Sequence, residues 1–152
     1  MSKTISFNQN KWDLRFLDMA KLVASWSKDP STQTGAVIVR PNKTVVSVGF
    51  NGFPMGMPDT PEMYSNRDEK YSRIVHSEMN AVLFSREPLD GCTLYTWPFL
   101  SCDRCCVHML QAGIDRFVAP RCLDEAKLAR WKDAFNRTTK YCSEAGADIT
   151  LI

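Results

Sequence analysis

The chain reads His76-Ser77-Glu78 and, further along, Cys102-Asp103-Arg104-Cys105. A closed structural zinc site normally takes four protein ligands, whereas a catalytic zinc keeps one position for water or substrate. His76, Cys102 and Cys105 would supply three ligands. The pattern therefore indicates a hydrolytic zinc site rather than a structural one, with Glu78 beside it as a non-ligating acid.

The spacing of these residues predicts that they stand at helix starts. Cys102 and Cys105 share one side of a first helical turn, where the helix dipole favours thiolates. His76 and Glu78 would point about 200° apart inside a helix, so both can face one site only at an N-terminus. Glu78 is thus expected to carry protons, while zinc would lower the pKa of a bound water.

Each motif alone is weakly diagnostic. The pattern H-x-E occurs by chance in many chains, and an isolated C-x-x-C is as often a redox pair or half of a zinc ribbon. The plain alternative is a set of buried cysteines with an unrelated histidine. The order of the two motifs and their flanking sequence favour the zinc site.

The composition is that of an ordinary globular protein, with 152 residues, 44% hydrophobic and 24% charged. We expect one domain spanning 1–152. The apolar runs are too short to cross a bilayer and the polar N-terminus has no signal-peptide core, so we expect a cytoplasmic protein. A net charge of +2 suits a small anionic substrate. The sequence shows no block of like charges such as nucleic-acid binders often carry.

Six cysteines would suggest disulfides in a small secreted protein, but this chain is long enough to bury a core without them. Two of the six are assigned to the metal site. We expect the other four to be reduced, partly buried thiols: Cys92, Cys106, Cys122 and Cys142.

The hydrophobic pattern predicts an α/β fold with a mixed five-stranded sheet covered by helices. Trp12, Phe16, Met19, Val23 and Trp26 form an apolar stripe, which predicts a helix from about Lys11 to Ser27. A hairpin of strands 35–39 and 45–50 follows, and then a long Gly- and Pro-rich loop from Asn51 to about Lys70. The remaining expected elements are helix 76–85, strand 93–97, helix 103–112, strand 116–119, helix 124–145 with breaks, and strand 148–151.

With these motifs and elements, the chain resembles the zinc-dependent cytidine deaminase superfamily, whose H-x-E and P-C-x-x-C signature it largely matches. It is most similar to the deoxycytidylate (dCMP) deaminase branch, which implies a three-layer fold. The likeness runs from about Trp12 to the C-terminus through the segments 27–36, 49–54 with Gly56, 76–81 and 111–114. One departure is Ser101, which stands where the family usually has proline. The nearest proline is Pro98, in a segment one residue longer.

The resemblance implies hydrolysis of dCMP to dUMP and ammonia, supplying dUMP for dTMP synthesis. Water would attack C4 of cytosine while Glu78 moves protons to N3 and to the leaving amine. The resemblance also implies that Asn51 holds the sugar hydroxyl and that the Ser77 backbone bonds the pyrimidine carbonyl. The alternative for Asn51 is a turn residue with a positive φ. Asn80 is expected to be a structural hydrogen-bonding residue.

A nucleotide substrate needs donors for its 5′-phosphate. The candidates are loop residues, each of which could instead be an ordinary surface group: Ser31, Thr32, Arg67, Lys70 and Arg73.

Many dCMP deaminases are homohexamers that dCTP activates and dTTP inhibits. Asn51, Gly52, Phe84 and Arg86 match that regulatory region, so we expect such effectors, with Mg²⁺ accompanying the triphosphates. The alternative for Arg86 is a cation that balances the dipole of the helix beginning at His76. We expect one zinc per subunit.

Two rival functions remain open. One is another nucleoside, base or tRNA-adenosine deaminase with the same core, although the dispersed charges do not favour RNA. The other is a zinc-stabilised binding module, which Glu78 opposes because a structural site has no use for an adjacent acid.

Overall fold

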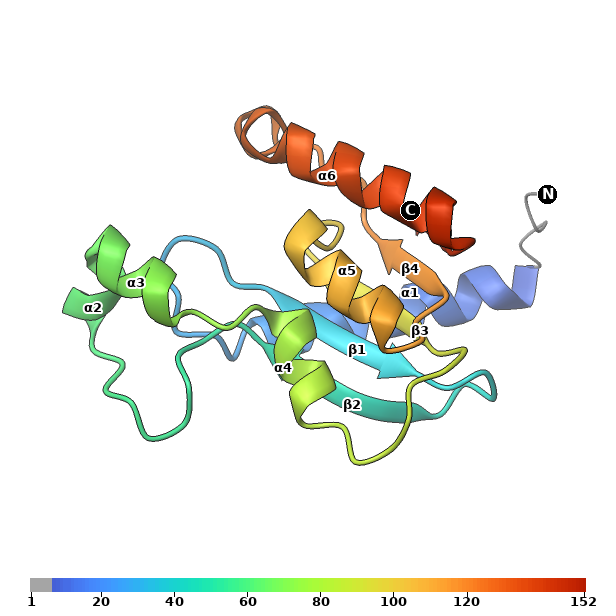
Figure 1. Cartoon of the computed structure of the whole chain (residues 1–152), viewed down its shortest axis with the longest axis horizontal. Helices are drawn as coiled ribbons and strands as arrows, with labels where there is room; N and C mark the ends of the chain where they lie inside the picture. The colour runs from blue at the N-terminus through green and yellow to red at the C-terminus, as the bar shows by residue number, and fades with distance from the viewer. Residues whose placement is uncertain (1–6) are drawn as a thin grey trace.

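A mixed sheet forms the centre of the protein. The computed structural model describes residues 7–152, so residues 1–6 of the predicted polar N-terminus lie outside it, and the single domain 1–152 stays a prediction. The sheet order is β2-β1-β3-β4-β5 (Figure 1). The strands are β1 (Gly35–Val39), β2 (Val45–Phe50), β3 (Thr93–Trp97), β4 (Arg116–Ala119) and β5 (Asp148–Leu151). The helices are α1 (Phe7–Ala24), α2 (Pro61–Ser65), α3 (Arg67–Arg73), α4 (Ser77–Leu83), α5 (Asp103–Gln111) and α6 (Glu125–Ala145).

Strand direction changes across the sheet as the sequence predicts. Strand β1 pairs antiparallel with both β2 and β3, whereas β3, β4 and β5 are parallel. The predicted hairpin is confirmed, and Lys43 in its loop has a φ of 68°. The parallel half is reached through α5 and α6, as right-handed crossovers require intervening helices.

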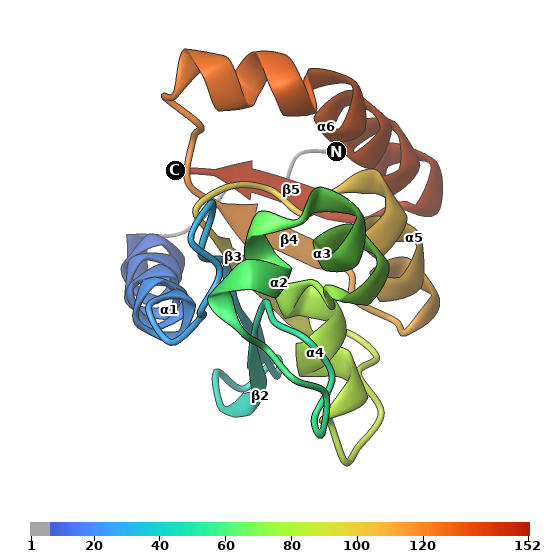
Figure 2. The same ribbon diagram turned by 90° about the vertical axis from the view of Figure 1, so that its left-hand side faces the viewer.

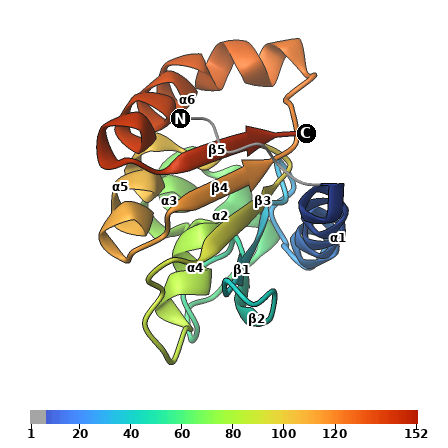
Figure 3. The ribbon, with the colours of Figure 1, turned by 90° about the vertical axis from the view of Figure 1, so that its right-hand side faces the viewer.

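Alternate residues of the central strands face two different helix layers. Val37 packs with Phe16 and Ala20 of α1. Its neighbours Ala36 and Ile38 belong instead to a core shared with α4, α5 and α6. Figures 2 and 3 show α1 on one side of the sheet and these three helices on the other. The predicted three-layer arrangement is confirmed.

The first helix ends three residues earlier than predicted. Helix α1 ends at Ala24, not Ser27, and Trp26 is 52% exposed instead of lying in the core. Backbone N–H groups of Trp26 and Ser27 each bond the carbonyl three residues earlier. This tighter turn rotates residue 26 away from the apolar stripe.

The predicted long loop from Asn51 to Lys70 is partly wrong, because it contains α2 and the start of α3. Their N-caps, Thr60 and Asn66, accept hydrogen bonds from the backbone N–H groups of Met63 and Glu69. Thr60-Pro61 is a helix-start signal, but the helix that follows it has only five residues and is too short to show a helical hydrophobic pattern. The expected breaks in the last helix are also wrong, since α6 runs unbroken from its Asp124 cap to Gly146 at φ 76°.

Within residues 7–152, no helix combines the length and hydropathy that a membrane span requires.

Strand β2 and helix α4 approach so closely that only glycine fits at residue 49. A Cβ there would lie 2.3 Å from the Ser77 carbonyl oxygen and 2.5 Å from the Ala81 nitrogen. Both are backbone atoms, which cannot swing aside as a flexible side chain does. Gly49 therefore fixes the height of α4 above the sheet.

We predict that Gly49→Ala lowers the free energy of unfolding by about 3 kcal/mol, the upper end of the usual cost of overpacking. Urea denaturation followed by circular dichroism measures the change. Gly52→Ala is the matched control, because a Cβ there meets only the Tyr64 hydroxyl at 3.9 Å. Equal stability of the two variants would contradict the close approach.

Candidate active site

Two helices begin at the predicted metal ligands. His76 is the N-cap of α4 and Cys102 is the N-cap of α5, and neither side chain makes a capping hydrogen bond. The caps of α2, α3 and α6 all do. A side-chain cap typically contributes about 1 kcal/mol. Helices α4 and α5 forgo it, which leaves the imidazole and the thiol free for another purpose.

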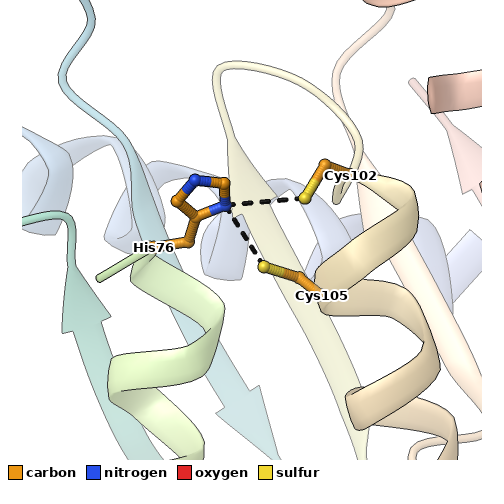
Figure 4. A group of neighbouring side chains, drawn as sticks. All are labelled: His76, Cys102 and Cys105. Atoms are coloured by element: carbon orange, nitrogen blue, oxygen red, sulfur yellow. Dashed lines mark hydrogen bonds between the residues drawn. The ribbon is translucent and has the colours of Figure 1, made fainter. Parts of the chain in front are cut away.

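The three predicted ligands meet between these helix starts (Figure 4). His76 Nδ1 lies 3.5 Å from Cys102 Sγ and 3.2 Å from Cys105 Sγ. All three donor atoms lie within 4.8 Å of one another, and residues 7–152 contain no second such group of three. Ligands around a tetrahedral zinc at roughly 2.0–2.3 Å are separated by similar distances. One nitrogen and two sulfurs therefore fit zinc with one position left open.

The cluster favours charge separation when it holds no metal. The pKa of His76 is raised to about 9, chiefly because its ring hydrogen-bonds the Cys102 sulfur. The pKa of Cys102 is lowered, first by its hydrogen bond with Cys105, while the same contact raises the pKa of Cys105. One thiolate is thus already favoured, and binding of a divalent metal would displace the remaining protons.

Glu78 lies in the first turn of α4 and is 6% exposed. Its Oε2 accepts a hydrogen bond of 2.7 Å from Ser101 Oγ. His76 is the N-cap of α4, and His76 and Glu78 line the same cavity, as their predicted position at a helix N-terminus requires. Glu78 does not belong to the group of three metal donors.

A cavity opens beside the cluster, and its lining comes from five stretches of the chain: 29–34, 51, 70–78, 96–102 and 130–135. Of the predicted substrate residues, it is lined by Asn51, Ser77, Ser31 and Thr32. His76, Glu78 and Cys102 lie on the same wall. The remaining lining residues are Asp29, Thr34, Lys70, Tyr71, Ile74, Thr96, Trp97, Phe99, Leu100, Arg130, Trp131 and Phe135.

Asn51 is buried and hydrogen-bonded to the loop that precedes β1. Its Nδ2 donates to Asp29 Oδ2 at 3.2 Å and to the Thr32 carbonyl at 3.0 Å, and its Oδ1 accepts from the Thr34 N–H at 2.9 Å. Among the described residues other than glycine, only Lys43 has a positive φ, so the turn alternative for Asn51 is wrong. Asn51 shapes the cavity wall and keeps a free lone pair on Oδ1.

Asn80 is structural, as the sequence predicts. Its Nδ2 donates to the Phe50 carbonyl at 2.8 Å and so ties α4 to the end of β2.

The predicted phosphate cations occupy three different environments. Lys70 lines the cavity and pairs with buried Asp29 at 2.9 Å. Arg67 lies over the Tyr71 ring, 5.2 Å from its centroid, at a neighbouring surface hollow. Arg73 does not line the cavity, because its guanidinium pairs with Glu69 on its own helix.

Helix α6 supplies cavity residues that the sequence reasoning missed. Arg130 donates to the Tyr71 hydroxyl at 2.5 Å and lines both the cavity and the adjoining hollow. Phe99 packs against Trp131 and Phe135, with ring centroids 6.4 and 5.6 Å apart. The only sequence signal is an aromatic pair one turn apart on a long helix, which reads as ordinary core packing.

The predicted regulatory residues lie near the ends of β2 and α4. Gly52 pairs with Val75 in an isolated bridge. Helix α4 ends at Leu83, with Phe84 as its C-cap, so the predicted helix end at residue 85, next to Arg86, is wrong. Ser85 Oγ instead closes a turn by donating to the Glu87 carbonyl at 2.9 Å. Arg86 thus lies beyond the last turn, where a dipole-balancing role is weak.

The other four cysteines are free thiols, as predicted. Cys92, Cys106 and Cys142 are buried, and Cys122 is partly exposed. Cys106 Sγ lies 3.7 Å from Cys142 Sγ, so it packs toward α6 while its neighbour Cys105 faces His76.

A family model described as the cytidine and deoxycytidylate deaminase zinc-binding region matches residues 10–120. The chain belongs to this family. The match spans both metal-binding motifs and Glu78, which agrees with the geometry found here.

Several relatives support the same family. An uncharacterized deaminase of the luxG 3′ region of Aliivibrio fischeri is 41% identical over 143 residues, covering 94% of this chain and 95% of that protein. The deoxycytidylate deaminase of Homo sapiens is 34% identical over 116 residues, covering 71% of this chain and 64% of that enzyme. The probable deoxycytidylate deaminase of Caenorhabditis elegans is 40% identical over 106 residues, covering 67% of this chain and 53% of that protein.

Solved structures share the fold. The dCMP deaminase of cyanophage S-TIM5 in complex with dCMP and dUMP is 20% identical, with a TM-score of 0.73 over 93% of this chain and 97% of that one. Its apo form gives a TM-score of 0.71. The three-layer fold is therefore that of a known deaminase.

We predict that Cys105→Ala abolishes stable zinc binding, because two remaining ligands cannot hold the metal against a chelator. Cys106→Ala is the matched control, since the adjacent thiol faces Cys142. Metal analysis after dialysis against a weak chelator should find about one zinc per chain in the parent and control. Equal zinc in both variants would exclude Cys105 as a ligand.

Proposed function

We propose that this chain catalyses the hydrolytic deamination of dCMP to dUMP and ammonia. One observation carries the proposal: a single cavity is lined by His76 and Cys102 of the metal-ligand cluster, by Glu78, and also by the cations Lys70 and Arg130. A pyrimidine nucleotide has its reactive C4 and its phosphate at opposite ends. The family membership and the deoxycytidylate deaminases among the relatives support the same reaction.

His76, Cys102 and Cys105 would hold one zinc per subunit. When bound, zinc lowers the pKa of water enough to supply a nucleophile near neutral pH. Glu78 is the acid and base: its carboxylate takes one proton from the attacking water and passes it to N3. It then takes the second proton, from the hydroxyl that the water leaves on C4, and delivers it to the leaving amine, so that ammonia departs as the C4 carbonyl forms. Its burial keeps bulk water from competing for these protons.

The other cavity residues would orient the nucleotide. Asn51 Oδ1 has a lone pair for the sugar hydroxyl, and the backbone of Ser77 at the start of α4 would bond the pyrimidine carbonyl. Ser31 and Thr32 line the same wall and supply hydroxyl groups near the sugar or phosphate.

Lys70 and Arg130 would bind the 5′-phosphate, with Arg67 near the adjoining hollow. Arg130 is the stronger candidate. Asp29 forms an ion pair with Lys70, whereas the partners of the Arg130 guanidinium are the neutral Tyr71 hydroxyl and the Trp131 ring. A role for Arg73 stays a prediction.

Regulation and assembly complete the proposal. We infer a homohexamer that dCTP activates and dTTP inhibits, with Asn51, Gly52, Phe84 and Arg86 at the effector site and Mg²⁺ accompanying the effectors. The product dUMP would feed dTMP synthesis, and we expect a cytoplasmic enzyme. The resemblance to dCMP deaminases supports these inferences.

We predict that the parent protein deaminates dCMP far faster than CMP or deoxycytidine. Glu78→Gln should lower kcat by about 10³-fold or more, because it removes the proton carrier. It should keep zinc and folding, since Glu78 is not a ligand. Loss of cytosine absorbance measures turnover, with dCTP or dTTP added to each reaction.

An inactive parent with about one bound zinc would instead favour another deaminase substrate or a zinc-stabilised module. A hyperbolic substrate curve indifferent to both triphosphates would remove the regulatory part alone.

We predict that Arg130→Ala raises the KM for dCMP by about tenfold, the loss of one charge-assisted phosphate contact. The KM for deoxycytidine should change little, because that substrate has no phosphate. Lys132→Ala is the control, an exposed cation on the same helix that does not line the cavity. An equal rise in KM for dCMP and deoxycytidine would show that Arg130 maintains the shape of the cavity and does not bind the phosphate.

A further inference from the structure

The loop before α5 places a buried serine against Glu78. Ser101 is 1% exposed, and its Oγ donates a 2.7 Å hydrogen bond to Glu78 Oε2. A serine hydroxyl has one proton to donate. That proton is committed to the carboxylate oxygen.

Helix α6 anchors the backbone of Ser101 through a hydrogen bond. The fully buried Thr138 donates from Oγ1 to the Ser101 carbonyl at 2.9 Å. On the other side of the loop, Thr96 Oγ1 donates to the Phe99 carbonyl at 2.8 Å. The loop backbone is therefore anchored at Ser101 and at Phe99, so Ser101 offers its hydroxyl to Glu78 from a fixed backbone position.

This donor comes from the part of the loop that departs from the resemblance. The family usually has proline before the first cysteine, and a proline side chain has no hydroxyl. A buried serine needs a hydrogen-bond partner and commonly finds a backbone carbonyl. Here the partner is the carboxylate of Glu78, beside the metal-ligand cluster.

We propose that Ser101 is a positioning residue for Glu78. Its hydroxyl holds Oε2 and leaves Oε1 to exchange protons with water and the pyrimidine ring. The inference rests on the proposed deaminase function and adds to it a residue that sets the orientation of the acid.

The expected size of the effect follows from geometry. The terminal torsion of glutamate is broad, so without a fixed donor the carboxylate samples many orientations. A displacement of roughly 1 Å at a reacting group can cost about 100-fold in rate. Substrate binding should change little, because Ser101 does not line the cavity.

The test compares Ser101→Ala and Ser101→Thr with the parent on dCMP. We expect Ser101→Ala to lower kcat by about 10- to 100-fold with KM changed less than about threefold. The zinc content should stay at the parent value, and Ser101→Thr, which keeps the hydroxyl, should recover most of kcat. Cys106→Ala is the control, since it truncates a fully buried side chain on the neighbouring helix whose sulfur faces Cys142 and which does not line the cavity.

A crystal structure of Ser101→Ala supplies a readout apart from turnover. We expect the Glu78 carboxylate to be rotated or split between conformers. An unmoved carboxylate, a kcat within about twofold of the parent, or a loss no larger than that of Cys106→Ala would overturn the proposal. Loss of zinc in Ser101→Ala would also overturn it, by showing a structural role. Failure of the deaminase function itself would appear separately, as an inactive parent.

Discussion

Gly49 is in close backbone contact with the first turns of α4. The position of His76 and Glu78, at the start of this helix, follows from that contact. A side chain at residue 49 would meet the Ser77 carbonyl oxygen at 2.3 Å, so α4 can sit this low on β2 only above a glycine. Its N-terminus then faces that of α5. His76 Nδ1 consequently reaches both cysteine sulfurs within 3.5 Å. The close packing of α4 on the sheet therefore determines whether His76 can reach the two cysteines.

The opposite wall depends on one buried carboxylate. Asp29 is 6% exposed and accepts hydrogen bonds from the Ser31 N–H, Asn51 Nδ2 and Lys70 Nζ. An unpaired charge at this depth would be costly, and these three donors offset that cost. The network joins the loop before β1, the end of β2 and helix α3. This wall of the cavity is thereby held together by side-chain hydrogen bonds, although it is built largely from loops.

The sequence predicted most of the elements and the grouping of His76, Cys102 and Cys105, because both are encoded locally. Period-2 and period-3.6 patterns located the sheet and most helices, and two short motifs named His76, Cys102, Cys105 and Glu78. The misses are non-local. Arg130 reaches the cavity only because α6 crosses back over the sheet, and the contact between Ser101 and Glu78 joins residues 23 positions apart. Helices α2 and α3 were missed because each spans fewer than eight residues.

The missing caps on α4 and α5 connect the chemistry to stability. Both helices begin with a residue whose side chain makes no capping hydrogen bond, so each forgoes about 1 kcal/mol. Thiolates near a helix N-terminus recover part of that cost through the dipole. A metal that joins His76 to Cys102 and Cys105 would tie the two helix starts together and recover more, in proportion to its affinity. The residues that would hold the metal therefore also link the stability of the folded state to metal binding.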